Sequence, residues 1–338
     1  MSEYSPQPAP PITAVMTQML AGFQVSQALY VVAKLDICTM LDDGPQTTAK
    51  LAELSGAQVR PLSRIIRTLS MLGLFRSEGD LVETTPLGAT LSRNHPETLC
   101  NVAEMWMETH YAPFGELLHT VRTGEPAAQR FFGQSLFDWI GEDEGRTAQF
   151  AQAMTDVTGS MRKGLFDGYE LPAGELVADI GGSDGSVLAE LIGNRPERRG
   201  IVFDQPAVVP VATEAMTVRR MADQVKVIGG DFFQEVPAAD VYLLSMILHD
   251  WDDDSAVKLL HTIRRSADAA RLVIVEGVVP ADDAPHPMKL IDLTMLGITR
   301  GWERTADEFA ELLAAGGYRL DRILDRPSPF SIIEATAR

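Results

Sequence analysis

The run Leu176-Val-Ala-Asp-Ile-Gly-Gly-Ser-Asp-Gly185 constrains the fold of this chain more than any other stretch. It begins with the β-forming residues Leu176, Val177 and Ile180, it ends in glycines, and from Ser186 apolar residues recur at helical spacing. This succession predicts a buried strand, a tight turn and a helix, which is how a doubly wound α/β domain opens. Such domains bind ligands at the carboxyl ends of their strands, so the turn is a candidate binding element.

The glycine spacing narrows the class of ligand. Gly181, Gly182 and Gly185 form G-G-x-x-G, which differs from the G-x-G-x-x-G of dinucleotide-binding turns. Asp179 and Asp184 put negative charge beside the turn. That charge would repel a pyrophosphate and attract a ligand that carries an ammonium and a sulfonium group. A plain glycine turn without a ligand is the alternative, and the motif alone does not decide between them.

Strands and helices alternate from residue 171 to the end of the chain. Strands are predicted at 176–180, 200–203, 225–228, 240–245, 272–276, 318–324 and 330–335, with helices at 185–194, 208–221, 253–267 and 305–316. This alternation predicts βαβ units and a parallel sheet core. Only a short turn separates the last two strands, so we expect them to pair antiparallel.

The N-terminal part has the order of elements of a winged helix-turn-helix. Residues 47–56 predict a capped short helix that ends at a glycine, residues 59–72 predict a second helix, and residues 76–85 predict a hairpin. One function for this arrangement is DNA binding through the second helix, where Arg60, Arg64 and Arg67 share one side. Residues 1–105, however, carry seven Lys and Arg against ten Asp and Glu. A DNA-binding domain is usually basic, so we expect a reused scaffold and no nucleic-acid partner.

The first helix, predicted from residue 12, is apolar but has no preceding domain on which to pack. It could fold back on its own domain. Packing on a second copy of the chain is the stronger expectation, because an uncovered apolar helix face is costly. We therefore predict a homodimer formed through the N-terminal helices, preceded by a disordered lead at residues 1–11.

Residues 101–170 are mostly helical and dense in aromatic residues and methionine. Most of these side chains will belong to a core, but the density is high for a segment between two domains. Aromatic and methionine side chains suit the wall of a pocket for a flat apolar ligand. The domain plan is thus a winged-helix dimerisation domain at 12–100, a helical linker and lid at 101–170, and a Rossmann-like domain at 171–338.

Acidic side chains follow the second and third predicted strands. Asp204 lies 23 residues after Gly181, where an acid can accept hydrogen bonds from both ribose hydroxyls of an adenosine ligand. In Gly229-Gly-Asp-Phe-Phe233, Asp231 is placed to accept from an adenine amino group and Phe232 to flank the ring. A helix N-cap and a plain turn are the alternatives for these two sites.

The fourth strand is expected to deliver His249 to the ligand edge of the sheet, within Leu243-Leu-Ser-Met-Ile-Leu-His-Asp-Trp251. A histidine has a reference pKa of about 6.5 and can take a proton from a phenol near neutral pH. The acids at 252–254 could resemble a metal site, but they open a predicted helix, where acids cap the first turn. We expect no metal.

These motifs, together with Trp302-Glu-Arg-Thr305, occur in an order that resembles a known family. The chain is similar over nearly its whole length to the plant-type S-adenosylmethionine-dependent O-methyltransferases of the caffeate and hydroxyindole type, including bacterial relatives in aromatic natural-product pathways. The resemblance implies an α/β, doubly wound, Rossmann-like methyltransferase domain behind an N-terminal winged-helix dimerisation domain. It also implies S-adenosyl-L-methionine as cofactor and S-adenosyl-L-homocysteine as its product.

The resemblance assigns roles residue by residue. His249 is the general base, and Glu276 and Glu303 flank it, one of them orienting the imidazole; which one stays open. The cofactor contacts are Asp179, Gly181, Gly182, Asp204, Gly230, Asp231, Phe232, Ser245 and Trp251. The acceptor contacts are Trp106, Met107, Met154, Asp250 and Met295. Two positions depart from the family pattern: Ser245 stands where a lysine is frequent, and Ser183 replaces the third glycine of the plant motif.

The predicted function is methylation of a hydroxyl on an aromatic small molecule, such as a polyketide or other secondary metabolite. Two alternatives are a non-methylating enzyme of this fold, acting by hydroxylation or decarboxylation, and a ligand-responsive winged-helix regulator.

The net charge of −18 argues against nucleic-acid and anionic-membrane partners. Two cysteines, and no apolar run long enough to span a bilayer, predict a cytoplasmic protein.

Overall fold

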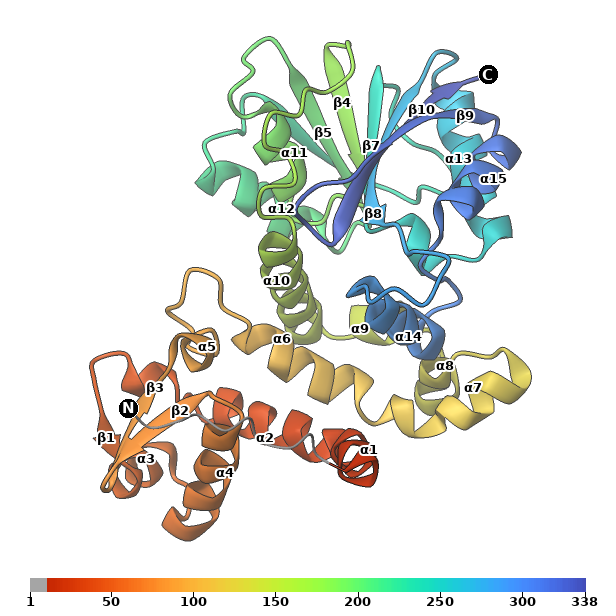
Figure 1. Ribbon diagram of the computed structural model, residues 1–338. Coiled ribbons are helices and arrows are strands. Elements are labelled where there is room, and N and C mark those ends of the chain that lie inside the picture. The colour runs from red at the N-terminus through yellow and green to blue at the C-terminus, as the bar shows by residue number, and fades with distance from the viewer. Residues whose placement is uncertain (1–10) are drawn as a thin grey trace, which may run out of the picture. The chain divides into compact units, whose positions relative to one another are not determined.

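The computed structural model describes residues 11–338, so residues 1–10 of the predicted lead lie outside the described residues. The chain divides into two compact units, Met1–Glu108 and Thr109–Arg338 (Figure 1). Each unit has its own hydrophobic core. The division falls inside the segment 101–170 that the sequence assigns to the linker and lid. No helix within residues 11–338 is long and apolar enough to cross a membrane.

The N-terminal unit combines helices with a small antiparallel sheet of order β1-β3-β2. Its elements are α1 (Ile12–Leu20), α2 (Gly22–Lys34), η1 (Thr39–Leu41), β1 (Gln46–Thr47), α3 (Thr48–Ser55), α4 (Val59–Met71), β2 (Phe75–Glu78), β3 (Leu81–Thr84), α5 (Pro86–Ala89) and α6 (Cys100–Met105). The two predicted helices and the hairpin are confirmed. The Thr47 hydroxyl caps α3 by accepting from the Lys50 N–H at 3.1 Å, and Gly56 ends it at φ 70°.

Helix α1 buries none of its residues. The side chains of Ile12, Met19 and Leu20 are 88%, 70% and 71% exposed, and Phe23 at the start of α2 is 55% exposed. The apolar surface that the sequence predicts for this helix is therefore uncovered in the single chain.

Helices open the second unit. They are η2 (Trp106–His110, a π-helix that spans the division between units), η3 (Pro113–Glu116), α7 (Leu117–Thr123), α8 (Ala127–Phe132), α9 (Leu136–Gly141) and α10 (Glu144–Met161). Phe132 and Trp139 stack at 4.1 Å within a small core that also contains Ile140 and Ile298. Asp143 caps α10 by accepting from the Arg146 N–H at 2.8 Å.

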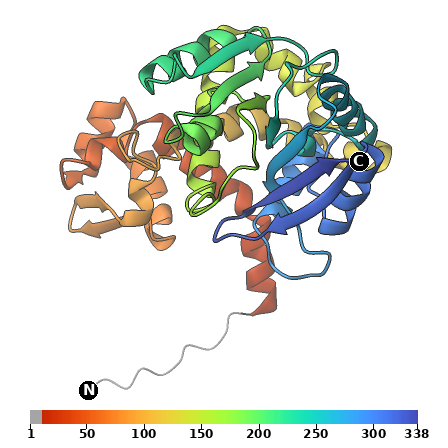
Figure 2. The ribbon, with the colours of Figure 1, turned by 90° about the horizontal axis from the view of Figure 1, so that it is seen from above.

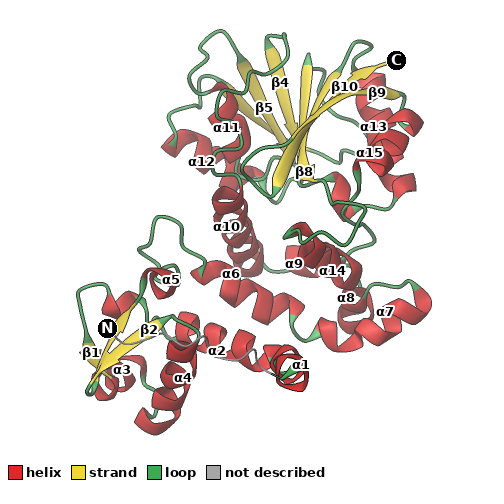
Figure 3. Ribbon diagram, viewed as in Figure 1, coloured by secondary structure: helices red, strands yellow, loops and turns green. Residues whose placement is uncertain are grey.

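A seven-stranded sheet forms the rest of the second unit (Figures 2 and 3). Its strands are β4 (Leu176–Ile180), β5 (Arg199–Asp204), β6 (Val225–Gly229), β7 (Val241–Ser245), β8 (Arg271–Gly277), β9 (Tyr318–Leu324) and β10 (Phe330–Ala337). The order is β6-β5-β4-β7-β8-β10-β9, parallel except for β10, which runs antiparallel to β8 and β9. This confirms the doubly wound α/β fold and the antiparallel C-terminal pair.

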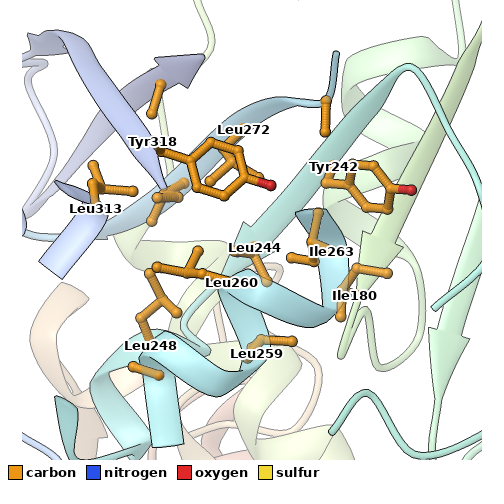
Figure 4. Close-up of a cluster of buried hydrophobic side chains, with 14 of the residues drawn as sticks. Ile180, Tyr242, Leu244, Leu248, Leu259, Leu260, Ile263, Leu272, Leu313 and Tyr318 are labelled. Carbon is orange, nitrogen blue, oxygen red and sulfur yellow. The ribbon is translucent and has the colours of Figure 1, made fainter. Parts of the chain in front are cut away.

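Alternate side chains of the strands enter two cores, one on each face of the sheet. The first core holds residues of α13 (Asp253–Ser266) and α15 (Ala306–Ala315), and the second holds residues of α11 (Ser186–Ile192) and α12 (Val209–Val218). Figure 4 shows Leu248 in the first core, beside Leu244 of β7 and Leu259 and Leu260 of α13. The segment that follows β7 is thus anchored in the core.

Two features differ from the sequence-based expectation. Strand β7 ends at Ser245, as the predicted range 240–245 has it, and Met246 follows in a left-handed conformation at φ 58°. His249 then lies in a single 3-10 turn that the sequence did not predict, η4 (Leu248–Asp250). Helix α14 (Met288–Ile298), which the sequence reading missed, buries Met288, Met295 and Ile298.

The strand order reverses direction at β4, which lies between β5 and β7. In open α/β sheets ligands bind at this switch point, outside the carboxyl ends of the strands. The glycine turn after β4, Asp204 at the end of β5 and the turn after β7 all lie at that edge.

Candidate active site

The glycine turn after β4 is closely packed against its neighbours. Gly181 and Gly185 have φ values of 70° and 69°, which L side chains rarely adopt. A Cβ atom at Gly181 would lie 2.4 Å from Cδ1 of Ile247, and one at Gly182 would lie 2.7 Å from Cγ of Asp179. The turn after β4 and the turn that carries His249 are therefore in direct contact.

The two acids beside the glycine turn behave differently. Asp184 forms an ion pair with Arg219 at 2.6 Å, so its charge is already neutralised within the protein. This corrects the expectation that Asp184 adds uncompensated negative charge beside the glycines. Asp179 is buried, and neither of its carboxylate oxygens has a hydrogen-bond partner. Burial, with a contribution from Asp204, raises the pKa of Asp179 to about 7.

Arg162 is a buried cation at the same turn that the sequence reading missed. Its guanidinium donates to the Thr158 hydroxyl at 3.1 Å and to the Ser186 hydroxyl at 3.2 Å, while its Nε atom is buried without a partner. Burial lowers its pKa. A single arginine at the end of a long helix carries no sequence signal for such a place, because α10 and the turn come together only in the fold.

The predicted nucleoside contacts follow β5 and β6. Asp204 accepts from the Ser183 N–H at 2.8 Å and from the Gln205 N–H at 2.7 Å, one bond to each oxygen. Each carboxylate oxygen has a second lone pair, so both can still accept from a hydroxyl. Gly230 donates to the Asp204 carbonyl at 2.9 Å, and Asp231 accepts from the Phe233 N–H at 2.8 Å.

Three aromatic rings gather beside these acids. Phe232 packs edge-on against Phe233 at 4.8 Å and against Trp251 at 5.9 Å. The Phe232 ring also lies 3.8 Å from the position of a Cβ atom on Gly181. Phe232 and Trp251 therefore belong to the same edge of the sheet as the glycine turn. Ser245 ends β7 at this edge.

His249 is held through one ring nitrogen. Its side chain is 4% exposed, and Nδ1 is hydrogen-bonded to Oε1 of Glu303 at 2.7 Å. Nε2 lies 3.7 Å from Oδ1 of Asp250, too far for a hydrogen bond. The imidazole is therefore oriented by Nδ1, and Nε2 is the nitrogen left for another group.

Glu276 contacts the backbone of the turn rather than the imidazole. Its Oε1 atom accepts from three successive N–H groups, those of Ile247 at 3.0 Å, Leu248 at 2.5 Å and His249 at 3.3 Å. The resemblance places two glutamates beside the base. Glu303 is hydrogen-bonded to the imidazole ring, and Glu276 is hydrogen-bonded to the backbone of the turn.

The charges around His249 are strongly coupled. Burial opposes the positive charge of the imidazole, but Asp250, Glu303 and Glu276 outweigh it and raise the pKa of His249 to about 10. Burial raises the pKa of Glu276 to about 7 and that of Asp250 to about 6. The three carboxylates therefore favour the protonated form of the imidazole.

The predicted acceptor contacts are spread over both units. Met154 lies on α10 and Met295 on α14, both within Thr109–Arg338. Trp106 and Met107 belong to Met1–Glu108, where Trp106 is 37% exposed and Met107 accepts from the Gln27 amide at 3.6 Å.

No group of three or more potential metal ligands occurs in residues 11–338. The acids at 252–254 have the predicted helical role, since Asp252 caps α13 by accepting from the Ser255 N–H at 2.9 Å.

The unsatisfied groups at the glycine turn match one class of ligand. The carboxylate of Asp179 lacks donors and the Nε atom of Arg162 lacks an acceptor, as a site for an amino-acid ammonium and carboxylate requires. Asp204 retains lone pairs for a ribose. The residues therefore fit a nucleoside joined to an amino acid, which is the chemistry of S-adenosylmethionine. The fold and this edge are those of a Rossmann-like domain whose residues fit a nucleoside-type cofactor.

Comparison with known proteins identifies the family. A family model for the O-methyltransferase domain matches residues 114–319, and one for the O-methyltransferase dimerisation domain matches residues 17–94. The chain belongs to the O-methyltransferase family and is an S-adenosylmethionine-dependent methyltransferase.

Individual relatives cover nearly the whole chain. The chain is 38% identical to the phenazine O-methyltransferase PhzM of Lysobacter antibioticus, over 99% of each protein. The crystal structure of LaPhzM matches with a TM-score of 0.93 and 38% identity, covering 97% of this chain and 100% of that one. The structure of NcsB1, an O-methyltransferase from neocarzinostatin biosynthesis in complex with S-adenosylmethionine and 2-hydroxy-5-methyl naphthoic acid, matches with a TM-score of 0.82 and 30% identity, covering 93% and 96%.

Proposed function

We propose that this protein transfers the methyl group of S-adenosylmethionine to a hydroxyl of a planar aromatic small molecule, with His249 as general base. The observation that carries the proposal is the geometry of His249. Its Nδ1 is fixed on a buried glutamate at 2.7 Å, and its Nε2 makes no hydrogen bond to its nearest carboxylate. A base needs this combination of a fixed ring and one free nitrogen.

The cofactor contacts are proposed from the groups at the sheet edge. Asp204 accepts from the ribose hydroxyls, Asp231 accepts from the adenine amino group, and Phe232 flanks the ring. The backbone at Gly181 and Gly182 allows close approach. Gly230, Ser245 and Trp251 complete the predicted set, with Ser245 supplying a hydroxyl or backbone contact. Asp179 and Arg162 are the counter-charges for the amino-acid end, and the unsatisfied atoms of both support this role.

His249 does the chemistry that the protein itself must supply. The bound cofactor supplies a methyl group activated by a positively charged sulfur, so the acceptor oxygen needs only deprotonation, alignment and a water-free site. In its neutral form, His249 takes the hydroxyl proton on Nε2. Glu303 then stabilises the imidazolium through Nδ1, and Glu276 keeps the turn in place. Asp250, half-buried beside Nε2, contacts the acceptor.

An aromatic acceptor is supported by side chains and by relatives. Met154, Met295, Trp106 and Met107 are flexible or flat apolar side chains of the kind that line sites for planar ligands. The relatives described above are named for a phenazine and crystallised with a naphthoic acid. Both are fused aromatic systems, so a fused phenol from a secondary-metabolite pathway is the acceptor class we propose.

We also propose that the protein works as a homodimer. The match to a dimerisation domain over residues 17–94 supports this. So does helix α1, whose apolar side chains nothing in the described chain covers. The proposed dimer buries them against a second copy, and no nucleic-acid or membrane partner is part of the proposal.

Methyl transfer from labelled S-adenosylmethionine to a panel of hydroxylated phenazines and naphthoates tests the function. With the best acceptor, His249→Ala should lower turnover by about 10²–10⁴-fold. Cofactor affinity should stay within about threefold, since His249 holds no cofactor group. His261→Ala is the control, because His261 is an exposed histidine on α13. Full activity of His249→Ala would refute the base assignment, and no transfer to any phenol would refute the acceptor class.

A further inference from the structure

Arg304 is one of the most completely buried large side chains among residues 11–338, at 1% exposure, although it carries a full charge. Its guanidinium donates hydrogen bonds mainly to the turn that carries His249. It donates to the Leu248 carbonyl at 2.8 Å, to the Trp251 carbonyl at 2.9 Å and to the Asp253 carboxylate at 2.8 Å.

Arg304 and Glu276 satisfy opposite ends of the same turn. Glu276 accepts from the N–H groups of residues 247–249, and Arg304 donates to the carbonyls of residues 248 and 251. An anion at free N–H groups and a cation at free carbonyls is the arrangement that stabilises helix termini. A turn of only three residues cannot hold itself by internal bonds, so it depends on these two side chains.

The backbone of the Arg304 segment also presses on the turn. A Cβ atom at Gly301 would lie 1.9 Å from the His249 carbonyl oxygen and 2.5 Å from the Trp251 nitrogen. Glu303, the residue before Arg304, bonds the imidazole itself. The Glu303 N–H in turn donates to Asp292 on α14 at 2.9 Å. One segment, residues 301–304, therefore fixes the ring, its carboxylate partner and the backbone between them.

We infer that Arg304 is a positioning residue for His249, which locks the turn so that the imidazole stays on Glu303 with Nε2 presented to the acceptor. The inference rests on the proposed role of His249 as base. Arg304 does not touch the ring and acts through the backbone of the turn. Placement matters because an error of about 1 Å can cost about 100-fold in rate.

Arg304→Lys keeps the charge but cannot reach both carbonyls and Asp253 from one planar group. It should fold, bind S-adenosylmethionine within about threefold of the parent, and lose about 10–100-fold in kcat with little change in KM. The His249 imidazole should titrate at lower pH by NMR, since a loosened ring is stabilised less by Asp250, Glu276 and Glu303. Arg264→Lys is the matched control, because Arg264 also bonds two carbonyls, those of Asp268 and Arg338, but away from the turn.

A purely structural role predicts another pattern for Arg304→Lys: a lower melting temperature with unchanged kcat and an unchanged imidazole titration in the folded protein. That pattern overturns the inference.

If Arg304→Lys does not fold, the variant Asp253→Asn provides the test. The Asp253 side chain is 59% exposed, so its substitution frees the Arg304 guanidinium from this ion pair without burying a charge. An imidazole titration identical to the parent in Asp253→Asn would then overturn it. The titration needs no turnover, so it separates this inference from failure of the base assignment, which an active His249→Ala would reveal.

Discussion

At the scale of single residues, burial and the neighbouring carboxylates have opposite effects on the pKa of His249. Burial alone would keep the imidazole of His249 neutral, yet three acids surround it and raise its pKa to about 10. The nearest of them, Glu303, forms a hydrogen bond of 2.7 Å to Nδ1 and is itself 4% exposed. The carboxylates therefore favour the protonated imidazole, which becomes a competent base when it loses that proton.

Glu303→Gln tests this balance. The glutamine can still accept from Nδ1 but no longer supplies charge, so the pKa of His249 should fall well below that of the parent. Because the folded pKa is raised, the charged imidazole stabilises the parent below about pH 6.5, its unfolded value. That stabilisation is lost as the pH rises through about 10. Methyl transfer should rise with pH over the same range, and the rise should shift to lower pH in the variant.

NMR titration of the imidazole in the ligand-free protein provides the measurement. Glu311→Gln, an exposed glutamate on α15, is the control and should leave the titration unchanged. A parent imidazole that titrates at or below about 6.5 would show that the three acids do not act on it as described.

At the scale of elements, two turns at the switch point carry the site. The strands and most helices were predictable because alternation and helical spacing are local patterns. The turn η4 was not, because Met246 ends β7 in a left-handed conformation without a glycine to mark it. Helix α14 was not predicted, because only the packing of the fold shows which of its apolar residues are buried. Candidate residues at strand ends could be read from motifs, but Arg162 and Arg304 act through contacts that only the fold creates.

Gly185→Ala probes the glycine turn. Gly185 has φ 69°, and a Cβ atom there would lie 2.7 Å from both Met216 Cε and Val202 Cγ2. We expect a loss of about 1–3 kcal/mol in the free energy of unfolding and weaker cofactor binding, because strain and overpacking act together. Gly168→Ala is matched in φ, at 66°, but meets nothing within 4 Å. Equal unfolding free energies for the two variants, measured with urea, would contradict the packing argument.

At the scale of the whole molecule, the exposed apolar surface of α1 indicates that the chain is not a monomer. The apolar side chains of α1 are exposed to an extent that isolated proteins rarely tolerate over a continuous patch. The family match assigns this region to a dimerisation domain. The apolar residues of this helix are visible in the sequence, but only the fold shows that its own unit leaves them uncovered.

Met19→Asp should weaken the dimer, because it places a charge on that apolar surface. Light scattering should give twice the chain mass for the parent and a shift toward the single-chain mass for the variant. Val218→Asp on α12 is the control, since Val218 is also exposed, at 76%, but lies in the other unit. A parent that is monomeric at micromolar concentration would refute the dimer.

The proposed mechanism requires Nε2 of His249 to receive the proton of the acceptor hydroxyl. A crystal structure with S-adenosylhomocysteine and the best acceptor measures this directly, as the distance from Nε2 to the hydroxyl oxygen. We expect a distance of about 2.6–3.2 Å, with Nδ1 still hydrogen-bonded to Glu303. A hydroxyl oxygen far beyond hydrogen-bond reach of Nε2, with another side chain within reach of it, would refute His249 as the base.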